Sequence, residues 1–321
     1  MASKTRASSI ILLLPLLLLS QCFCDSDAYE RVTYWGQNAK VEGDLVDACY
    51  SEAYEIINIA FLDTFGNAAT PTLNLTGHCG DSSPNKRPCT EYASQIKACQ
   101  EHGVKIFLSL GGYYGNYQLA SVDEAKQLAE YLWNNFLGGQ TESELPLGNV
   151  VLDGIDFFIK HGLPNFYDTL AKQLHAYSQE KKFYLSAAPH CEIKDKYLYS
   201  AIKTGAFDKL HVLFYEKPSC LYQDANTSKF LTAWDSWADK YPSPKLYAAV
   251  YPIYGRTYNV PLRSLNQKLI PVLKSTRNFG GVVVSNRSDD VQTGDPTYCY
   301  QIDFDQDLQS APTINLMMPS A

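Results

Sequence analysis

The sequence predicts an α/β protein built as a single closed (β/α)8 TIM barrel with disulfide-bonded loops. Short β-branched or apolar runs alternate along the chain with longer segments of helical periodicity. We count eight such alternations, the number of units in a closed parallel barrel. No internal repeat, low-complexity tract or proline-rich linker divides the 321 residues, and barrels of this length commonly form one domain.

The expected strands are short apolar segments rich in β-branched or aromatic residues. In chain order they cover residues 32–35, 56–62, 104–110, 150–159, 183–188, 211–215, 246–251 and 281–285. Helical periodicity is clear at 125–136 and 166–179, where apolar residues recur at intervals of three and four. Chemistry in such a barrel is expected at the carboxyl ends of the strands.

The first 25 residues have the pattern of a cleaved secretory signal. Lys4 and Arg6 precede an unbroken apolar run at 10–19, and small and polar residues follow at 22–25. The run is shorter than the roughly 20 residues that span a membrane, which argues against an anchor. We therefore predict a signal peptide at 1–25, a barrel domain at 26–321, and a secreted protein that has no membrane partner after cleavage.

The charge balance is acidic, with a formal net charge of −7 at pH 7. Such a surface repels nucleic acid and acidic lipid, and no basic cluster offsets it. We therefore exclude nucleic acid as a partner and attribute the charge to solubility.

The chain contains nine cysteines, of which Cys22 and Cys24 lie at the edge of the predicted signal. In an oxidising compartment the remaining seven are expected to pair. No Cys-x-x-Cys pair with matching histidine spacing occurs, so we expect no metal site and no cofactor. Three Asn-x-Ser/Thr triplets, at Asn74, Asn226 and Asn286, are candidate N-glycosylation sites on surface loops.

Several motifs resemble those of the plant class III chitinases of glycoside hydrolase family 18. They are Tyr34-Trp35-Gly36-Gln37-Asn38, Ser109-Leu110-Gly111-Gly112, the segment 132–139, Leu152-Asp153-Gly154-Ile155-Asp156 and Ala187-Ala188-Pro189. The resemblance covers nearly the whole mature chain. It implies the barrel fold and a secreted protein whose destination is the apoplast or the vacuole.

The resemblance also implies three disulfides. They join Cys49 to Cys99, Cys79 to Cys89 and Cys191 to Cys220. Cys299 is left over, and three alternatives stay open for it: a buried thiol, a bridge to Cys24, or an intermolecular bridge.

The family's catalytic strand reads Asp-x-x-Asp-x-Asp-x-Glu, and here it is degenerate. Asp153 and Asp156 match, but Phe158 and Lys160 replace the last two acids. In this family the acetamide of the substrate attacks the anomeric carbon while the glutamate protonates the leaving oxygen. Period-two alternation predicts that Asp156, Phe158 and Lys160 face the barrel mouth together, so both working carboxylates are lost.

A lysine is a poor replacement for the glutamate. Its ordinary pKa, about 10.4, makes it a reluctant proton donor, and an ammonium ion opposes the positive charge of the transition state. We expect Lys160 to form a salt bridge with Asp156 or Glu216.

Other positions of the expected groove partly match the family pattern and partly depart from it. The resemblance implies that Tyr34, Gln37, Asp63, Tyr215 and Glu216 are its binding residues. Two more positions depart from the family pattern: Leu213 stands where a glutamine is usual, and Ser285 stands where a tryptophan usually supports the sugar. Loss of that surface costs sugar binding about 1 kcal/mol or more.

Three acids could in principle substitute for the missing pair. Asp63, Glu192 and Glu216 each follow or end a predicted strand, but the simpler interpretation is that they are solvated or pair with Lys160. His161 and His190 are expected to have structural roles.

The cereal xylanase-inhibitor proteins of this family show a similar strand, with phenylalanine at the position of Phe158. This resemblance favours a protein without hydrolytic activity that inhibits a microbial glycanase in plant defence. Three alternatives stay open: a lectin that binds chitin-type oligosaccharides, a chitinase with a substitute acid, and a storage protein.

Overall fold

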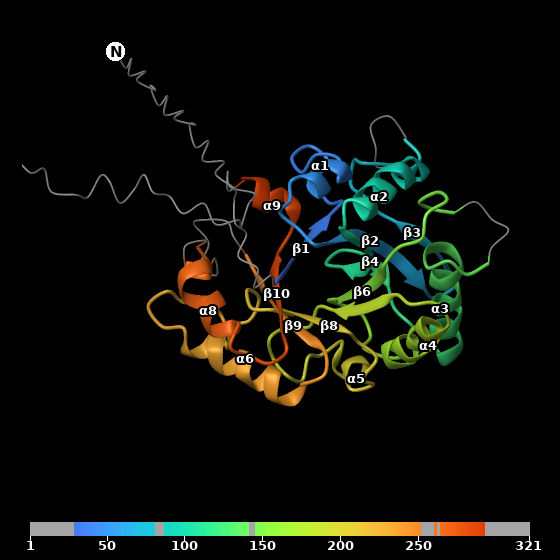
Figure 1. Cartoon of the computed structure of the whole chain (residues 1–321). Helices are drawn as coiled ribbons and strands as arrows, with labels where there is room; N and C mark the ends of the chain where they lie inside the picture. Colours follow the sequence, from blue (N-terminus) through green and yellow to red (C-terminus); the bar gives the residue numbers. More distant parts are fainter. Residues whose placement is uncertain (1–28, 81–86, 141–144, 252–259, 262–263, 293–321) are drawn as a thin grey trace, which may run out of the picture. The chain divides into compact units, whose positions relative to one another are not determined.

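A computed structural model of the chain describes residues 29–80, 87–140, 145–251, 260–261 and 264–292 (Figure 1). The predicted signal peptide, together with Cys22, Cys24 and Cys299, lies outside the described residues. Those predictions therefore stay predictions.

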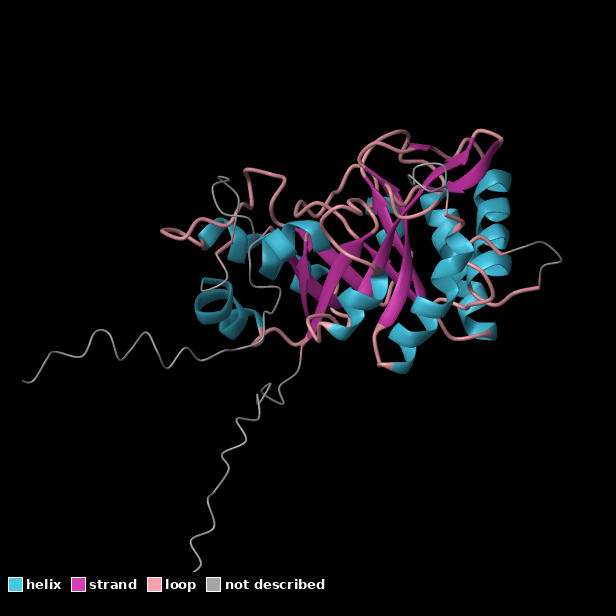
Figure 2. Cartoon of the chain, turned by 90° about the horizontal axis from the view of Figure 1, so that it is seen from above, coloured by secondary structure: helices cyan, strands magenta, loops and turns pink. Residues whose placement is uncertain are grey.

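Eight parallel strands form the predicted barrel. They are β1 (Glu30–Trp35), β2 (Ile56–Gly66), β4 (Lys105–Gly112), β6 (Gly154–Ile159), β7 (Tyr184–Ala187), β8 (Lys209–Leu213), β9 (Lys245–Val250) and β10 (Phe279–Val284). Each strand pairs with its neighbours in chain order, and β1 pairs with both β2 and β10, which closes the sheet. All eight predicted strands coincide with one of these, so the TIM-barrel prediction is confirmed (Figures 1 and 2).

The fourth predicted strand was too long at its amino end. It begins at Gly154 rather than at residue 150. The preceding residues form other bonds: Leu152 N–H donates to the Phe136 carbonyl, and the Asp153 carboxylate accepts from Ile106 N–H at 2.8 Å. Asp153 therefore anchors the start of the strand against its neighbour β4 and lies far along the strand from the mouth.

Two short strands were not predicted. β3 (Ala69–Leu73) pairs antiparallel with the extended end of β2, and β5 (Asn116–Tyr117) pairs with β2 at Thr64 and Phe65. Their consequence for the site is that β2 continues past the barrel and forms one wall above its mouth.

Helices surround the barrel (Figure 2). They are α1 (Leu45–Tyr50), α2 (Tyr92–Glu101), α3 (Val122–Phe136), α4 (Tyr167–Glu180), α5 (Tyr199–Ile202), α6 (Ser228–Lys240), α8 (Ile270–Leu273) and α9 (Arg287–Gln292), with a 3₁₀ turn η2 (Cys89–Glu91) and a π turn η3 (Leu265–Leu269). The two predicted helices are α3 and α4. Ser121 caps α3 by accepting a hydrogen bond from Glu124 N–H. No helix in the described ranges is long and apolar enough to cross a membrane.

The core has two parts, as strands buried on both faces require. One apolar layer lies between strands and helices, and a second, smaller cluster fills the barrel itself. The inner cluster includes Tyr34, Phe61, Phe158 and Leu213. Its upper surface is the floor of the mouth.

The three disulfides implied by the resemblance are present. Cys49–Cys99 joins α1 to α2, Cys79–Cys89 joins the segment after β3 to η2, and Cys191–Cys220 joins the segments after β7 and β8. The last of these connects two loops at the mouth of the barrel.

Candidate functional site: a groove at the barrel mouth

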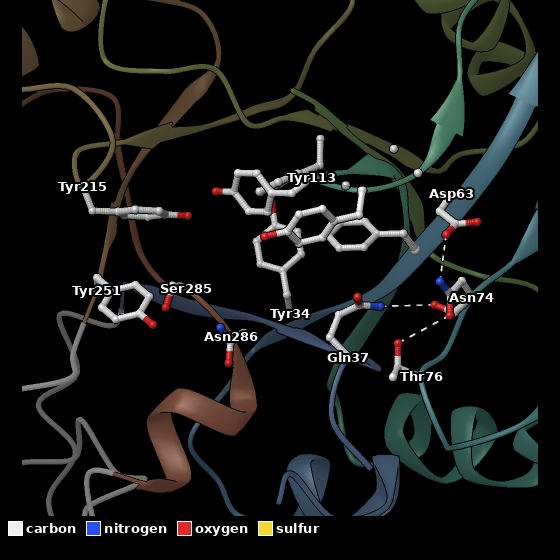
Figure 3. A pocket seen from close by; sticks show the side chains of 16 residues that line it. Tyr34, Gln37, Asp63, Asn74, Thr76, Tyr113, Tyr215, Tyr251, Ser285 and Asn286 are labelled. Carbon is white, nitrogen blue, oxygen red and sulfur yellow. Dashed lines mark hydrogen bonds between the residues drawn. The ribbon is translucent and has the colours of Figure 1, made fainter. Parts of the chain in front are cut away.

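A pocket of about 460 Å³ opens at the carboxyl ends of the strands (Figure 3). Its lining is rich in aromatic side chains and in small polar groups. The lining residues are Tyr34, Gln37, Phe61, Asp63, Asn74, Thr76, Gly111, Gly112, Tyr113, Tyr114, Gly115, Phe158, Tyr215, Tyr251, Ser285 and Asn286. Pockets of this size and composition bind small organic ligands, and aromatic faces suit the apolar faces of sugar rings.

Strand β6 places the degenerate motif at the floor of this mouth. The predicted alternation is confirmed: Asp156, Phe158 and Lys160 are all buried on the inner side, while Phe157 and Ile159 pack in the outer layer. Of the three, Phe158 reaches the pocket lining.

Asp156 is buried and fully engaged by its neighbours. Its Oδ2 accepts hydrogen bonds from Tyr34 Oη at 3.0 Å and Ser109 Oγ at 2.8 Å, and its Oδ1 accepts from Ser186 Oγ at 2.6 Å. His211 Nδ1 lies 3.4 Å from Oδ1. Burial alone would raise the Asp156 pKa, but His211 and the hydroxyl donors outweigh it, so the pKa lies below its ordinary value. This carboxylate stays ionised and cannot serve as a proton donor.

Phe158 fills the place of an acid with an aromatic cluster. Its ring centroid lies 5.2 Å from that of Tyr34 and 5.3 Å from those of Phe61 and Tyr113. The cluster depends on close packing, because a Cβ on Gly112 (φ +94°) would lie 2.9 Å from a Phe61 ring carbon. The floor of the pocket is therefore apolar at the position where the family has a carboxylate.

Lys160 does not form the salt bridge that we expected. Its amine donates to the Ala188 carbonyl oxygen at 2.6 Å and lies 4.5 Å from the Phe158 ring centroid. No ion pair of Lys160 within 4.0 Å occurs in the described part of the chain. Burial lowers the Lys160 pKa to about 8, although Glu216, Asp195 and Asp156 act in the opposite direction at longer range.

The carboxylates near Lys160 pair with His190 instead. His190 Nδ1 lies 2.6 Å from Asp195 Oδ2, and Nε2 lies 2.7 Å from Glu216 Oε2. Burial would lower the His190 pKa, but the two carboxylates outweigh it and raise it. The pKa values of Asp195 and Glu216 are lowered, because their hydrogen bonds to His190 and the charge of Lys160 outweigh burial. His190, which the sequence indicated only as structural, bridges two acids.

Of the five predicted binding residues, four line the pocket: Tyr34, Gln37, Asp63 and Tyr215. Gln37 also donates to the Ala60 carbonyl at 2.6 Å, which fixes its amide. Glu216 is not among the described lining residues. Its carboxylate accepts hydrogen bonds from Tyr113 Oη and binds His190, so it supports the wall of the pocket from behind.

Of the two other predicted departures, Ser285 lies in the groove and Leu213 does not. Leu213 is fully buried in the inner cluster, which also contains Phe158, and it is not among the described lining residues. Ser285 lines the pocket directly after β10, and Tyr251 lies close by at the end of β9. The other two of the three alternative acids also have hydrogen-bond donors nearby: Asp63, in the pocket lining, accepts from Asn74 Nδ2 at 2.8 Å, and Glu192 accepts from Ser219 Oγ at 3.2 Å.

Several lining residues were not predicted from the sequence. Tyr113 and Tyr114 follow the Ser109-Leu110-Gly111-Gly112 motif directly, so the end of the third predicted strand could have indicated them. Asn74 and Thr76 lie in the segment after β3, and the sequence indicated them only as parts of a glycosylation triplet. Among the described residues, no group of three metal-ligating side chains could hold an ion.

Comparisons with known proteins agree with this arrangement. An acidic endochitinase of Cicer arietinum is 44% identical over 284 residues, covering 87% of this chain and 94% of that protein. A xylanase and α-amylase inhibitor protein from Scadoxus multiflorus superposes with a TM-score of 0.76 at 34% identity, covering 83% of this chain and 96% of that one. A chitinase-like lectin from tamarind gives a TM-score of 0.72 at 32% identity, covering 82% and 96%.

The relatives thus include chitinases, inhibitors and a lectin on one barrel, and fold alone does not choose among them. The sequence profile described as glycosyl hydrolases family 18 matches residues 30–306, almost all of the barrel. The chain belongs to glycosyl hydrolases family 18.

Proposed function

We propose that this chain is a secreted member of its family that does not hydrolyse chitin and acts in plant defence by binding a microbial glycanase of the xylanase type. The composition of the pocket floor supports the loss of chitin hydrolysis. The two positions of the catalytic acids hold a phenylalanine ring and a buried amine.

Hydrolysis in this family needs a proton donor and a carboxylate that orients the acetamide of the substrate. Phe158 supplies neither function. The Lys160 amine donates to a backbone carbonyl and adds positive charge beside the place where an oxocarbenium ion would form. Loss of a general acid alone removes roughly two to four orders of magnitude in rate.

A substitute acid has little support in the structure. Glu216 supports the pocket wall from behind, and His190 and Lys160 hold its pKa below the ordinary value. Asp156 is held ionised in the same way. A carboxylate that stays ionised at neutral pH cannot protonate a leaving group.

The exposed aromatic rim of the pocket supports a protein partner. Tyr114 is 98% exposed and Tyr113 is 45% exposed. Exposed tyrosines are typical of energetically important residues at protein interfaces. The structurally similar protein from Scadoxus multiflorus is an inhibitor of xylanase and α-amylase.

The test is a titration of secreted fungal xylanases and α-amylases with the purified protein. We expect inhibition of at least one enzyme with a dissociation constant in the nanomolar range, and weaker inhibition by the Tyr114→Ala variant. Asp123→Ala, on the first turn of α3, is the matched surface control. Absence of a complex with every enzyme tried, at micromolar concentrations, would contradict this target class.

The aromatic lining favours a second candidate, a lectin for chitin-type oligosaccharides. Tyr215 and Tyr251, whose ring centroids lie 5.8 Å apart, form one wall, and Asp63 and Gln37 offer polar groups on the other (Figure 3). Calorimetric titration of protein made without N-glycans with chitotriose distinguishes the candidates. Saturable binding without enzyme inhibition supports the lectin.

A further inference from the structure

Two of the three candidate glycosylation asparagines line the pocket itself. Asn74 lies on the side of Asp63, and Asn286 lies on the side of Ser285 and Tyr251 (Figure 3). Asn226 is not among the described lining residues and is exposed ahead of α6.

Asn74 is held firmly while its amide stays accessible. Its backbone N–H donates to the Phe61 carbonyl at 2.9 Å, and its carbonyl accepts from Phe61 N–H at 3.2 Å. Gln37 Nε2 donates to the same carbonyl at 3.2 Å. The side chain is exposed and directs Nδ2 to Asp63 Oδ2 at 2.8 Å, inside the pocket lining. A group attached to Nδ2 therefore starts at the pocket wall.

Asn286 is a weaker candidate, because its amide is used to begin a helix. Its Oδ1 accepts from Asp289 N–H at 2.8 Å and from Ser288 Oγ at 2.9 Å, and its Nδ2 donates to Asp289 Oδ2 at 2.5 Å. The Asn74 amide makes two longer bonds, from Nδ2 to Asp63 and from Thr76 Oγ1 to its Oδ1 at 3.4 Å, and it begins no helix. A glycosylated amide keeps one N–H, which is enough for the bond to Asp63.

We propose that Asn74 carries an N-linked glycan whose N-acetylglucosamine core lies in the pocket, so that the chain's own carbohydrate occupies its groove. The core of an N-glycan is a β-1,4-linked pair of N-acetylglucosamines, the same unit that chitin repeats. A pocket with seven aromatic side chains in its lining, inherited from a chitin-binding family, suits that disaccharide.

The modification is a transfer from a lipid-linked oligosaccharide diphosphate in the secretory pathway, which the predicted signal peptide implies. The Asn74 Nδ2 nitrogen displaces the diphosphate from the anomeric carbon. The carbon–nitrogen bond forms, the carbon–oxygen bond breaks, and one amide proton is released. Occupation of the groove by this glycan does not require that the chain's target be a glycanase.

A tethered ligand has a high effective concentration, because attachment at the pocket wall makes its binding intramolecular. Soluble oligosaccharides then compete poorly for the groove. The glycan would close the inherited sugar site and leave the surface around it for other partners.

The first test uses the full chain secreted from cells that attach oligomannose glycans. Glycopeptide mass spectrometry reports occupancy at Asn74 and Asn226, and an endoglycosidase is then applied to native and to denatured protein. We expect occupancy at Asn74, with native cleavage more than ten-fold slower there than at Asn226, and equal rates after denaturation. An unmodified Asn74, or equal native rates, would overturn the proposal.

The second test removes one triplet at a time. Thr76→Val abolishes the Asn74 triplet and keeps the asparagine, and Thr76→Ser, which keeps the triplet, controls for the altered pocket lining. Ser228→Ala abolishes the Asn226 triplet. We expect Thr76→Val to bind chitotriose more than ten-fold more tightly than the wild type in calorimetry, and Ser228→Ala to match the wild type. If Thr76→Val binds no better than the wild type, including the case in which neither binds, the glycan does not occupy a sugar-binding groove.

Discussion

The amine of Lys160 donates a hydrogen bond of 2.6 Å to the carbonyl oxygen of Ala188, at the end of the neighbouring strand. A buried ammonium ion with a neutral acceptor is costly, and burial lowers its pKa to about 8. In the unfolded chain the pKa is near the ordinary lysine value, so above about pH 8 the unfolded state holds more protons than the folded state. This group therefore makes stability rise with pH from about 8 upward.

Lys160→Met should be more stable than the wild type below about pH 8. The variant keeps an unbranched side chain and removes the cost of burying charge, which we place at about 1–3 kcal/mol. Urea unfolding at pH 6, 7, 8 and 9 measures the difference, which should shrink as pH rises. If the difference in unfolding free energy between the two proteins stays constant with pH, the Lys160 charge does not destabilise the fold.

His190 should contribute in the opposite direction. Its pKa is raised by Asp195 and Glu216, so its stabilisation is fully present below the ordinary histidine pKa of about 6.5 and is lost as pH rises through the folded value. His190→Gln should lose about 1–3 kcal/mol of unfolding free energy at pH 6 and less at pH 9. His175→Gln, at an exposed position of α4, is the control. An equal loss at both pH values would mean that packing, rather than charge, explains the effect.

Restoring both acids should recover little hydrolysis. Phe158→Asp with Lys160→Glu places carboxylates at the two motif positions, but Leu213 and Ser285 still depart from the family pattern. The new aspartate also faces the apolar ring cluster of Tyr34 and Phe61. Release of product from a chitin oligomer, with the protein made without N-glycans, is the measurement. Cleavage by this double variant close to that of an active class III chitinase would show that the groove is otherwise intact.

A tryptophan at position 285 should strengthen sugar binding. Ser285 lines the pocket, and an indole there offers a stacking surface worth about 1 kcal/mol, or roughly five-fold in affinity. Calorimetry with chitotriose on protein made without N-glycans compares Ser285→Trp with Ser285→Ala. Equal affinities of the two variants would place the sugar away from this end of the pocket.

The sequence was enough for the barrel because each strand carries its own local signal. A buried parallel strand is a short apolar run, and eight such runs with helical segments between them admit few arrangements. The start of the fourth strand was wrong because Val150 and Leu152 are apolar for another reason: both belong to the layer between strands and helices. Local hydrophobicity does not distinguish the residues of a strand from buried loop residues that precede it.

The site was predictable along β6 and less so elsewhere. Alternation fixed the direction of Asp156, Phe158 and Lys160, since it is a property of the strand alone. The partner of Lys160 was not predictable in this way. Asp195 and Glu216, which lie on two different loops, both pair with His190, and the Lys160 amine therefore donates to a backbone carbonyl. Contacts between loops carry no periodic signal, so only the folded structure shows them.

The most direct test of the account is hydrolysis of a chitin hexamer by the purified wild-type protein, beside an active class III chitinase at equal concentration. We expect no product above the uncatalysed background, because Phe158 and Lys160 occupy the positions of the two working acids. Cleavage at a rate comparable to the active enzyme would contradict it and would require another proton donor in the groove.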